Sequence, residues 1–381
     1  MKAKSAGRAR FLLFLLAAGA IWLTNVHRVH ALDAQQRSRL VAELVERQLA
    51  TRGDDAPRMR AVNPEWDFMR RTFAVLALAN LALESRGPER ARLLLAIDDI
   101  VDATLSDDDA LGPRHFLMAY AGRGPFEDPE SRSLFVDGEI VMMLAARELV
   151  EPRRAGRATA LERAARITRT MSRSPSMSGE SYPNECWTFC NTAALAGLAM
   201  LDRVDGTARA EHEALAANWV RYAREHLVDH ETGLLVSSFT YAGATLDGPE
   251  GSSIWMSAHN LLLVDPVFAE DQYARAHREL HGAAIGYAWA REWPRGAAMR
   301  ADVDSGPIVP WLDASAGSSG LALLGASAFH DEAYLGGLLA SLELAGFRDG
   351  GRYFASNQAG DAVILYALSF GPLWRRVRSA A

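Results

Sequence analysis

The sequence predicts an all-α protein, an (α/α)6 barrel in which about twelve helices pack as a toroid of helix pairs. Hydrophobic residues recur with helical periodicity along almost the whole chain. Proline and glycine mark the boundaries between the periodic segments. No repeat of fixed period is present, which argues against a solenoid. Because twelve helices make six pairs, the number that closes such a barrel, we expect a closed toroid with a funnel on one face.

The expected helices follow one another in order, and several of their boundaries are explicit. Asn63-Pro64, Gly87-Pro88 and Asp265-Pro266 all stand at helix starts, where proline is well tolerated. The expected ranges are 34–52, 64–84, 88–105, 133–150, 157–172, 187–204, 208–227, 252–264, 266–288, 313–328, 331–345 and 359–375.

One internal segment has a different pattern. Residues 234–245 follow a Thr232-Gly233 turn and are rich in β-branched and aromatic residues that partly alternate with polar ones. This pattern predicts a small β-hairpin inserted between helices.

Residues 1–31 have the features of an export signal and stand apart from a single domain over residues 32–381. A basic start precedes an apolar run from Phe11 to Leu23, and Val29-His30-Ala31 offers the small residues that a signal peptidase reads. The run is short for a membrane span, but Trp22 and Arg28 flank it as interface anchors do. A cleaved leader and an uncleaved membrane anchor both stay open, and either places the body in the periplasm or otherwise outside the cytoplasm.

The charge distribution excludes some classes of partner. The formal charge is −6, and residues 1–31 carry five positive and no acidic side chains, so the body carries −11. An acidic body disfavours nucleic acid and anionic lipid as partners of the folded domain, and the N-terminal segment is where we expect a contact with membrane. A small-molecule substrate is the partner we expect.

The segment with the highest density of reactive groups is 180–191. It contains both cysteines of the chain, Cys186 and Cys190, and leads directly into an apolar helix. If Thr188 caps that helix, Cys190 lies in its first turn, where the helix dipole favours the thiolate. The alternative is that Cys190 is a small buried hydrophobe, and whether the two cysteines form a disulfide stays open.

Acidic residues supply further candidates. Asp302 and Asp304 lie in a loop of small residues, as a cation site, an acid/base pair or a solvated turn. Asp67 opens a helix, as either a surface acid that satisfies the helix dipole or a group that points into the funnel. Glu139 borders an apolar run, as either a solvated flank or an inward-facing group whose pKa burial would raise. Asp98, Asp99 and Asp102 match a magnesium-binding motif only weakly and are better interpreted as a solvated helix face.

Several signatures of cofactor chemistry do not occur in the sequence. It has no HExxH, no Walker loop, no GxSxG and no glycine-rich dinucleotide fingerprint. We therefore expect no metal and no cofactor.

The chain resembles the linalool dehydratase/isomerase family in several short runs that occur in the same order. These are Trp66-Asp67-Phe68, Gly138-Glu139, Cys190-Asn191 and the segments 201–207, 227–233 and 265–268, followed by the acidic loop 302–306. The resemblance implies a periplasmic, cofactor-free (α/α)6 barrel that assembles into a ring of subunits, so we expect a homo-oligomer. It implies dehydration and isomerisation of a tertiary allylic terpene alcohol by acid/base side chains in a hydrophobic pocket.

The resemblance also assigns positions. Asp67 stands at the family's aspartate and Cys190 at its second cysteine. The chain departs from the pattern at three positions: Ser181 replaces the first cysteine, Glu139 a histidine, and Phe73 a tyrosine. A serine cannot replace a thiol as a proton carrier unaided, whereas a desolvated glutamate can replace histidine. We therefore expect the pocket and the acid/base chemistry to persist with a different substrate.

These observations lead to one favoured function and two alternatives. We expect a cofactor-independent hydro-lyase or isomerase of a small apolar alcohol, with Asp67, Glu139 and Cys190 as catalytic groups. One alternative is an exported glycoside hydrolase or polysaccharide lyase, and the other is a membrane-anchored binding or scaffold protein. The residues expected to contact substrate are Phe73, Ser181, Tyr182, Cys186, Trp187, Asn191, Trp255, Asp302 and Asp304.

Overall fold

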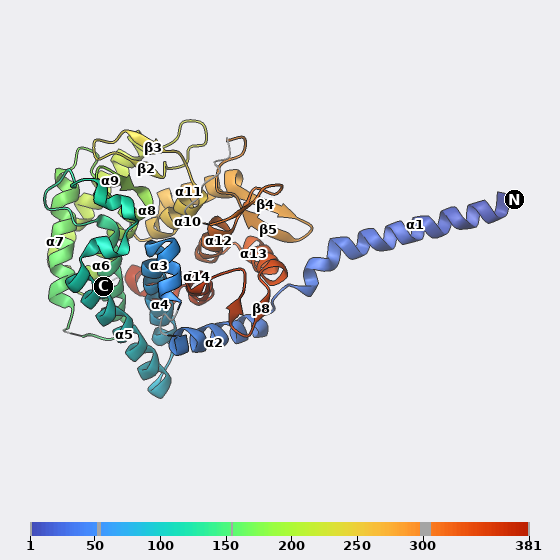
Figure 1. Ribbon diagram of the computed structural model, residues 1–381, viewed down its shortest axis with the longest axis horizontal. Helices are drawn as coiled ribbons and strands as arrows, with labels where there is room; N and C mark the ends of the chain where they lie inside the picture. The colour runs from blue at the N-terminus through green and yellow to red at the C-terminus, as the bar shows by residue number, and fades with distance from the viewer. Residues whose placement is uncertain (1, 52–54, 154, 298–305, 380–381) are drawn as a thin grey trace.

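The computed structural model is predominantly helical, as predicted, and carries small hairpins between its helices. It describes residues 2–51, 55–153, 155–297 and 306–379. Fifteen α-helices and nine short strands lie within these residues. The body is a rounded bundle from which one long helix, α1 (Lys2–Asn25), projects (Figure 1).

Six helices form a ring at the centre of the body, in which each contacts the next and the last contacts the first. Every residue of α6 is buried, because an inner helix meets the barrel axis on one side and the outer layer on the other. The inner helices are α4 (Pro64–Glu84), α6 (Leu134–Val150), α8 (Thr188–Leu201), α10 (Gly251–Leu261), α12 (Ala316–Ala328) and α14 (Gln358–Ser369).

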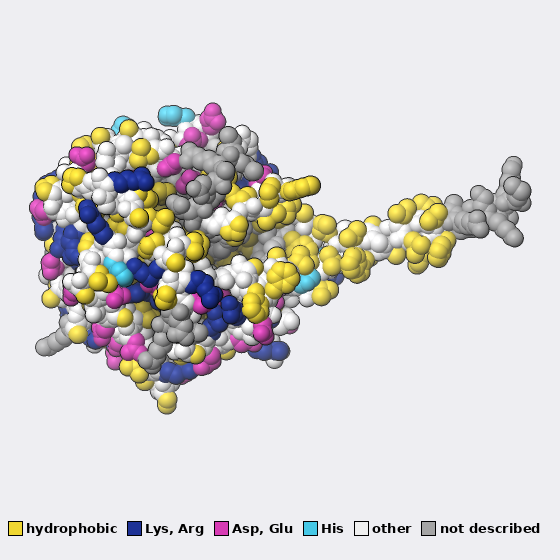
Figure 2. Space-filling model, in the orientation of Figure 1, with side chains coloured by type: hydrophobic (Ala, Val, Ile, Leu, Met, Phe, Trp, Pro, Cys, Tyr) yellow, Lys and Arg dark blue, Asp and Glu magenta, His cyan; other side chains and the backbone are white. Residues whose placement is uncertain are grey.

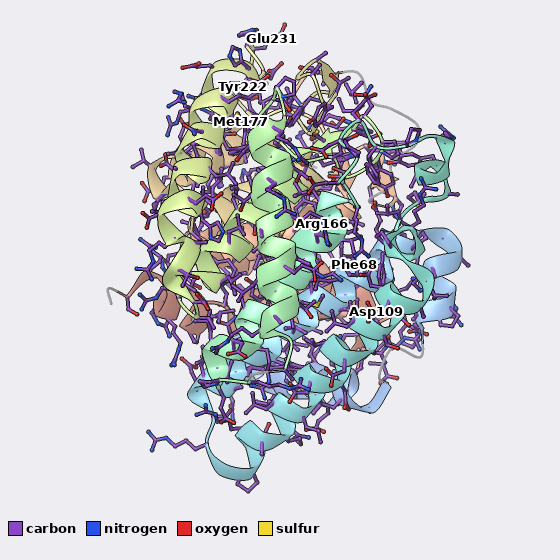
Figure 3. The ribbon with its side chains drawn as sticks, turned by 90° about the vertical axis from the view of Figure 1, so that its left-hand side faces the viewer. Phe68, Asp109, Arg166, Met177, Tyr222 and Glu231 are labelled. Atoms are coloured by element: carbon purple, nitrogen blue, oxygen red, sulfur yellow. The ribbon has the colours of Figure 1, made fainter. Side chains whose placement is uncertain are left out.

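Six more helices surround the ring, and each packs on an inner helix. Seen from the side, outer helices such as α7, which carries Arg166, cover the inner ring (Figure 3). These outer helices are α2 (Ala34–Thr51), α5 (Gly87–Leu111), α7 (Arg157–Arg173), α9 (Arg209–His226), α11 (Pro266–Leu280) and α13 (Glu332–Ala345).

The C-terminal segment secures the closure of the ring. Helix α14 packs against α4, and the short helix α15 (Pro372–Arg378) continues onto α4. The backbone N–H of Leu373 donates a 2.8 Å hydrogen bond to the side-chain oxygen of Asn80 in α4. Residues nearly 300 positions apart are thus joined at one seam.

The connections at the two ends of the helix pairs differ in length. An inner helix is followed by its outer partner after a short turn, as between α4 and α5 or α10 and α11. The longer connections precede the inner helices and carry the hairpins and three of the four short 3-10 and α segments. The N-terminal ends of the inner helices therefore form the loop-rich face. The short segments are α3 (Ala56–Val62), η2 (Pro113–Phe116), η3 (Ala119–Arg123) and η4 (Gly206–Ala208), the last of which instead precedes the outer helix α9.

The predicted hairpin at 234–245 is present but belongs to a larger sheet. Strand β2 (Ser238–Phe239) pairs with β3 (Thr245–Asp247) and also with β1 (Cys186–Trp187), which precedes α8. Three further two-stranded hairpins were not predicted: β4 (His281–Ala284) with β5 (Tyr287–Ala290), β6 (Ile308–Val309) with β7 (Ala314–Ser315), and β8 (Arg348–Asp349) with β9 (Arg352–Tyr353).

Three predicted helices end six or more residues from the observed position. The helix expected over 88–105 continues to Leu111. The helix expected over 266–288 stops at Leu280, because the chain turns into β4, whose paired residues include Gly282. The helix expected over 359–375 breaks at Gly371, whose φ of 129° no helix accommodates, and Pro372 starts α15.

The N-terminal segment contains one stretch, Phe11–Val29, that is long and apolar enough to cross a membrane, and none of it is buried against the body. This property suits a signal sequence as well as a membrane anchor. The 3-10 helix η1 (Val26–Val29) follows α1 and returns the chain to the body, where it contacts α13.

Candidate active site

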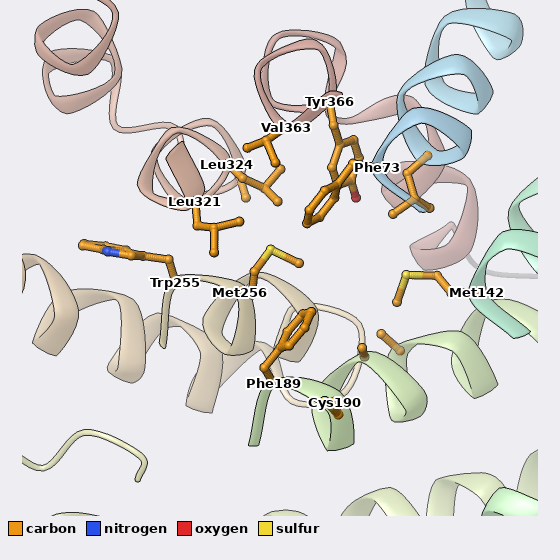
Figure 4. Packing of buried hydrophobic residues seen from close by; sticks show 14 of the residues in the cluster. Phe73, Met142, Phe189, Cys190, Trp255, Met256, Leu321, Leu324, Val363 and Tyr366 are labelled. Carbon is orange, nitrogen blue, oxygen red and sulfur yellow. The ribbon is translucent and has the colours of Figure 1, made fainter. Parts of the chain in front are cut away.

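The axis of the ring is lined by apolar side chains from the inner helices. Figure 4 shows side chains from opposite sides of the ring converging on one region. Alanine, leucine and methionine dominate here, and almost every contributor is buried. The labelled residues that share this region are Phe73, Met142, Phe189, Cys190, Met256, Leu321, Leu324, Val363 and Tyr366.

Glu139 is an ionisable group whose pKa this apolar surrounding changes. It lies on α6 with 3% of its surface exposed. Burial raises the pKa of its carboxyl from 4.5 to about 7, and the nearby Thr72 hydroxyl offsets part of the shift. Among the described residues, no cationic side chain forms an ion pair with it. A carboxyl with a pKa near neutrality exchanges protons readily in both directions, as a general acid and base requires.

Cys190 lies in the first turn of α8, but the expected cap is wrong: Trp187 is the N-cap residue, and the Thr188 hydroxyl donates to the carbonyl of Val236. Burial raises the pKa of the Cys190 thiol well above 9, a hydrogen bond with Ser181 opposes this shift, and the nearby charges of Glu65 and Glu139 add to it. Burial therefore outweighs the effect of the helix dipole, because desolvating a full charge is costly. Cys190 contributes a weakly polar, protonated thiol.

A tyrosine and a histidine complete the polar groups of the interior. The Tyr366 hydroxyl on α14 and Nε2 of His259 on α10 lie 3.0 Å apart, and the Tyr366 ring stacks on Phe73 at 6.2 Å. Burial lowers the pKa of His259 to about 3, so its ring is neutral. Burial and the charge of Glu139 raise the pKa of Tyr366, which keeps its proton. Tyr366 was not singled out in the sequence, where it reads as one more apolar position of an inner helix.

Asp67 has a different environment from Glu139, although both are buried acids. Its carboxylate forms ion pairs with Arg71 at 2.9 Å and Arg70 at 3.0 Å, and lies 3.6 Å from Arg60. Burial alone would raise the pKa of Asp67, but the charges and hydrogen bonds of Arg71 and Arg70 outweigh it and lower the pKa. Asp67 is therefore ionised at neutral pH and weakly basic.

A polar rim surrounds the start of α4 and α8 on the loop-rich face. Tyr182 donates a hydrogen bond to Glu65 and its ring stacks on Tyr120 at 4.4 Å. Glu185 accepts from the Tyr120 hydroxyl at 3.2 Å and from the Trp187 indole at 2.5 Å. Tyr182 and Trp187 were predicted from the sequence, but the two glutamates were not. Glu65 is 117 positions from its partner Tyr182, and Glu185 is 65 positions from its partner Tyr120.

The family model for linalool dehydratase/isomerase matches residues 159–354, just over half of the chain. The chain belongs to the linalool dehydratase/isomerase family. The matched region contains Ser181 and Cys190, whereas Asp67, Phe73 and Glu139 precede it. No curated protein matches this family member in sequence.

Among solved structures, this linalool dehydratase/isomerase family member is similar to a GH76 α-mannanase of Bacteroides thetaiotaomicron. The two share 13% sequence identity with a TM-score of 0.50, over 81% of this chain and 86% of the mannanase. At this identity the likeness shows a common fold, an (α/α)6 arrangement, and carries no information on substrate.

Three predicted contact residues have structural partners. The Asn191 amide holds the loop before α8 through the backbone N–H and C=O of Gly179, at 2.9 and 3.2 Å. The Trp255 indole donates a hydrogen bond to Ser318, and its aromatic ring packs against Tyr273 of the outer helix α11. Trp255 therefore lies between the inner and outer layers of helices and not on the barrel axis. Cys186 lies in β1 with its thiol buried, and both cysteines are free.

Asp302 and Asp304 lie outside the described residues. Within the described part of the chain, no group of three or more His, Cys, Asp or Glu side chains is arranged to hold a metal ion. Asp98 instead pairs with Arg147 at 2.7 Å and Arg153 at 2.8 Å, so the aspartate-rich motif serves an ion-pair network between α5 and the α6–α7 region.

Proposed function

We propose that this protein is a cofactor-independent hydro-lyase or isomerase that acts on a small apolar alcohol inside a twelve-helix (α/α)6 toroid. The observation that carries the proposal is Glu139: a carboxyl with a pKa of about 7, facing an apolar interior. Membership of the linalool dehydratase/isomerase family supports the reaction class. As for the resembling family, we propose a periplasmic homo-oligomer.

The proposed reaction needs one proton donor and one proton acceptor. Protonated Glu139 donates its proton to the substrate hydroxyl, the C–O bond breaks, and water leaves. The Glu139 carboxylate then accepts a proton from the adjacent carbon as the C=C bond forms, which restores the acid. The net change is alcohol to alkene plus water, and addition of water at another carbon of the allylic system would give an isomer. An apolar site strengthens the interaction between a carboxylate and the developing positive charge.

Cys190 and Tyr366 are proposed as neutral hydrogen-bonding groups for the substrate hydroxyl. Both keep their protons at neutral pH, and both lie within the electrostatic range of Glu139. Such groups orient the hydroxyl without competing for the proton that Glu139 transfers.

Asp67 was predicted from the sequence to share proton transfer with Glu139. Its ion pairs favour a positioning role instead. Three arginine side chains keep it ionised, so it is a poor proton donor. We propose that it holds the arginines in place near the start of α4, and that its negative charge persists through the reaction.

The test uses the purified full-length chain without added cofactor. It is incubated with tertiary allylic alcohols, including terpenoid ones, and products are followed by gas chromatography. We expect turnover that falls at least 100-fold in Glu139→Gln and is partly retained in Glu139→Asp. The matched control is Glu130→Gln, which changes an exposed glutamate paired with Arg169 and Arg173. Turnover that survives Glu139→Gln would contradict the proposal.

Glycoside hydrolysis is a second candidate, favoured by the polar rim. Glu65 and Glu185 lie among Tyr120, Tyr182 and Trp187, and aromatic faces beside carboxylates suit the binding of sugar rings. The same assay with mannose-containing and other oligosaccharides separates the two candidates. Release of sugar that depends on Glu65 and Glu185 but not on Glu139 would assign the rim, and not the interior, as the active site.

A further inference from the structure

Two hairpins beside the base of α1 carry an unusual set of exposed apolar side chains. Trp311, in the turn between β6 and β7, is 93% exposed, and its neighbours Val309 and Leu312 are about half exposed. Ile285 stands at the tip of the β4–β5 hairpin and is also about half exposed. The two hairpins are joined by a 2.8 Å hydrogen bond from the Trp289 indole to the carbonyl of Leu312.

The tip of the β4–β5 hairpin has a conformation that its sequence disfavours. Ala284 pairs with Tyr287, which leaves a two-residue turn in which Ile285 has a φ of 54° and Gly286 a φ of 82°. Such turns prefer Asn-Gly, and a β-branched residue in the left-handed region is strained. The fold thus holds an isoleucine outward where a polar residue would be more stable, which is typical of a functional contact.

The end of the N-terminal apolar segment packs directly on this hairpin. The His30 side chain and the Tyr287 hydroxyl are hydrogen-bonded at 2.9 Å, and the His27 and Tyr287 rings make an edge contact at 6.3 Å. The His27 ring lies so close to Gly286 that an added Cβ would be only 2.3 Å away. Cleavage after Ala31 would remove both histidines from a packed interface.

These contacts fix where a membrane would lie if α1 spans it. The 19-residue stretch Phe11–Val29 would be about 28 Å long as a helix, close to the hydrocarbon thickness of a bilayer. Its last residues would then lie at the membrane surface, and the hairpin packed against them must lie there too. Figure 2 shows hydrophobic side chains gathered where α1 meets the body.

We propose that the tips of the β4–β5 and β6–β7 hairpins form a membrane-contacting surface that inserts into the lipid interface beside an uncleaved α1. Ile285, Val309, Trp311 and Leu312 are the inserted side chains. Tryptophan is enriched at this depth of a bilayer because its ring is apolar and its indole N–H is polar. The body is thereby held flat against the bilayer and does not swing freely on a tether.

The test places a fluorescent reporter on the proposed surface of the full-length chain. Trp311→Cys and, separately, Ile285→Cys are labelled with an environment-sensitive dye, and the protein is reconstituted into phosphatidylcholine/phosphatidylglycerol vesicles with or without doxyl-labelled phosphatidylcholine. The native cysteines are both buried, which directs the dye to the introduced one. The matched control is Leu95→Cys, an exposed apolar position, 61% exposed, on the outer helix α5.

We expect lipid-borne doxyl groups to quench the dye at 311 and at 285 at least threefold, and to leave the dye at 95 unchanged. Two variants keep the test valid if one of them fails to fold. Equal quenching at all three positions, or none at 311 and 285, would overturn the proposal. A dye at 311 that shifts to the blue without doxyl quenching would also overturn it, because a second protein copy and not lipid would then cover the surface. N-terminal sequencing of the membrane-bound protein must find a start at Met1 or Lys2, and a start at Leu32 refutes the retained helix.

Discussion

Replacing Glu139 with glutamine should make the protein more stable at alkaline pH and change its stability little at acid pH. A pKa raised from 4.5 to about 7 means that the folded protein holds a proton that the unfolded chain releases between these values. The stabilisation from this proton is complete below pH 4.5, declines as pH rises to 7, and is absent above. Glutamine is neutral in both states, so Glu139→Gln escapes the decline.

The size of the effect follows from the two pKa values. One pKa unit corresponds to about 1.4 kcal/mol, so between pH 5 and pH 8 the wild type should lose roughly 2–3 kcal/mol of unfolding free energy relative to Glu139→Gln. Other titrating groups, such as Asp361 with its pKa of about 6, are common to both proteins and cancel in the difference.

The measurement is denaturant unfolding of both proteins, in one detergent solution, at pH 5 and pH 8. Glu130→Gln serves as the control, since this exposed carboxylate has a pKa lowered by its hydrogen bonds with Arg173 and Arg169 and should show no gain at pH 8. If the difference between wild type and Glu139→Gln does not change between the two pH values, Glu139 is not desolvated in the folded protein. The acid/base proposal would then lose its basis.

Three further outcomes are expected from the packing and hydrogen bonds of the inner ring. Gly138→Ala should destabilise the fold by about 1–3 kcal/mol, because its Cβ would lie 2.9 Å from a side chain of α8. Gly320→Ala on α12 meets open space and should be neutral or slightly stabilising. Equal melting temperatures for the two variants would contradict this prediction. Asn191→Ala should cost about 2–4 kcal/mol in thermal unfolding, since it leaves buried backbone groups of the preceding loop without partners, and a loss under 0.5 kcal/mol would show that the loop is held by other contacts. Cys186 and Cys190 should react with a thiol reagent at pH 8 at least 100-fold more slowly in the native protein than in denaturant, because burial raises both pKa values; rapid reaction of either thiol in the native protein would refute its burial.

The helices could be predicted well because outer helices such as α7 have hydrophobic periodicity, and inner helices such as α6 are long apolar runs. The short hairpins could not, because pairs of two to four residues are stabilised by neighbours far along the chain. The segment 281–290 illustrates this, since its small and apolar residues continue the pattern of α11 until Gly282 and Gly286 allow the turn. The helices could thus be predicted from local sequence, whereas the positions of the hairpin turns depend on tertiary packing.

The candidate site was predictable to a different degree for each residue. Glu139 was found because an acid beside a long apolar run is a local signal. The ion pairs of Asp67 with Arg70 and Arg71 were visible as i, i+3 and i, i+4 spacings, and they weaken its case as a proton carrier. Glu65 was missed because its partner Tyr182 is 117 positions away. The pairing of Tyr366 with His259 likewise depends on the meeting of two helices across the ring.

The seam between α14 and α4 has a consequence for how the chain reaches its folded state. During synthesis, the hydrogen bond between Asn80 and Leu373 can form only after almost the entire chain has been made. Until then the face of α4 that α14 covers is exposed, and each new helix pair can only extend an open arc. Among the contacts between neighbouring inner helices, the one that closes the ring therefore has the largest loop-closure entropy. A chain that ends before α14 should form an incomplete arc with exposed apolar faces on α4 and α12. Such an arc should associate with a second copy and not close into a smaller barrel.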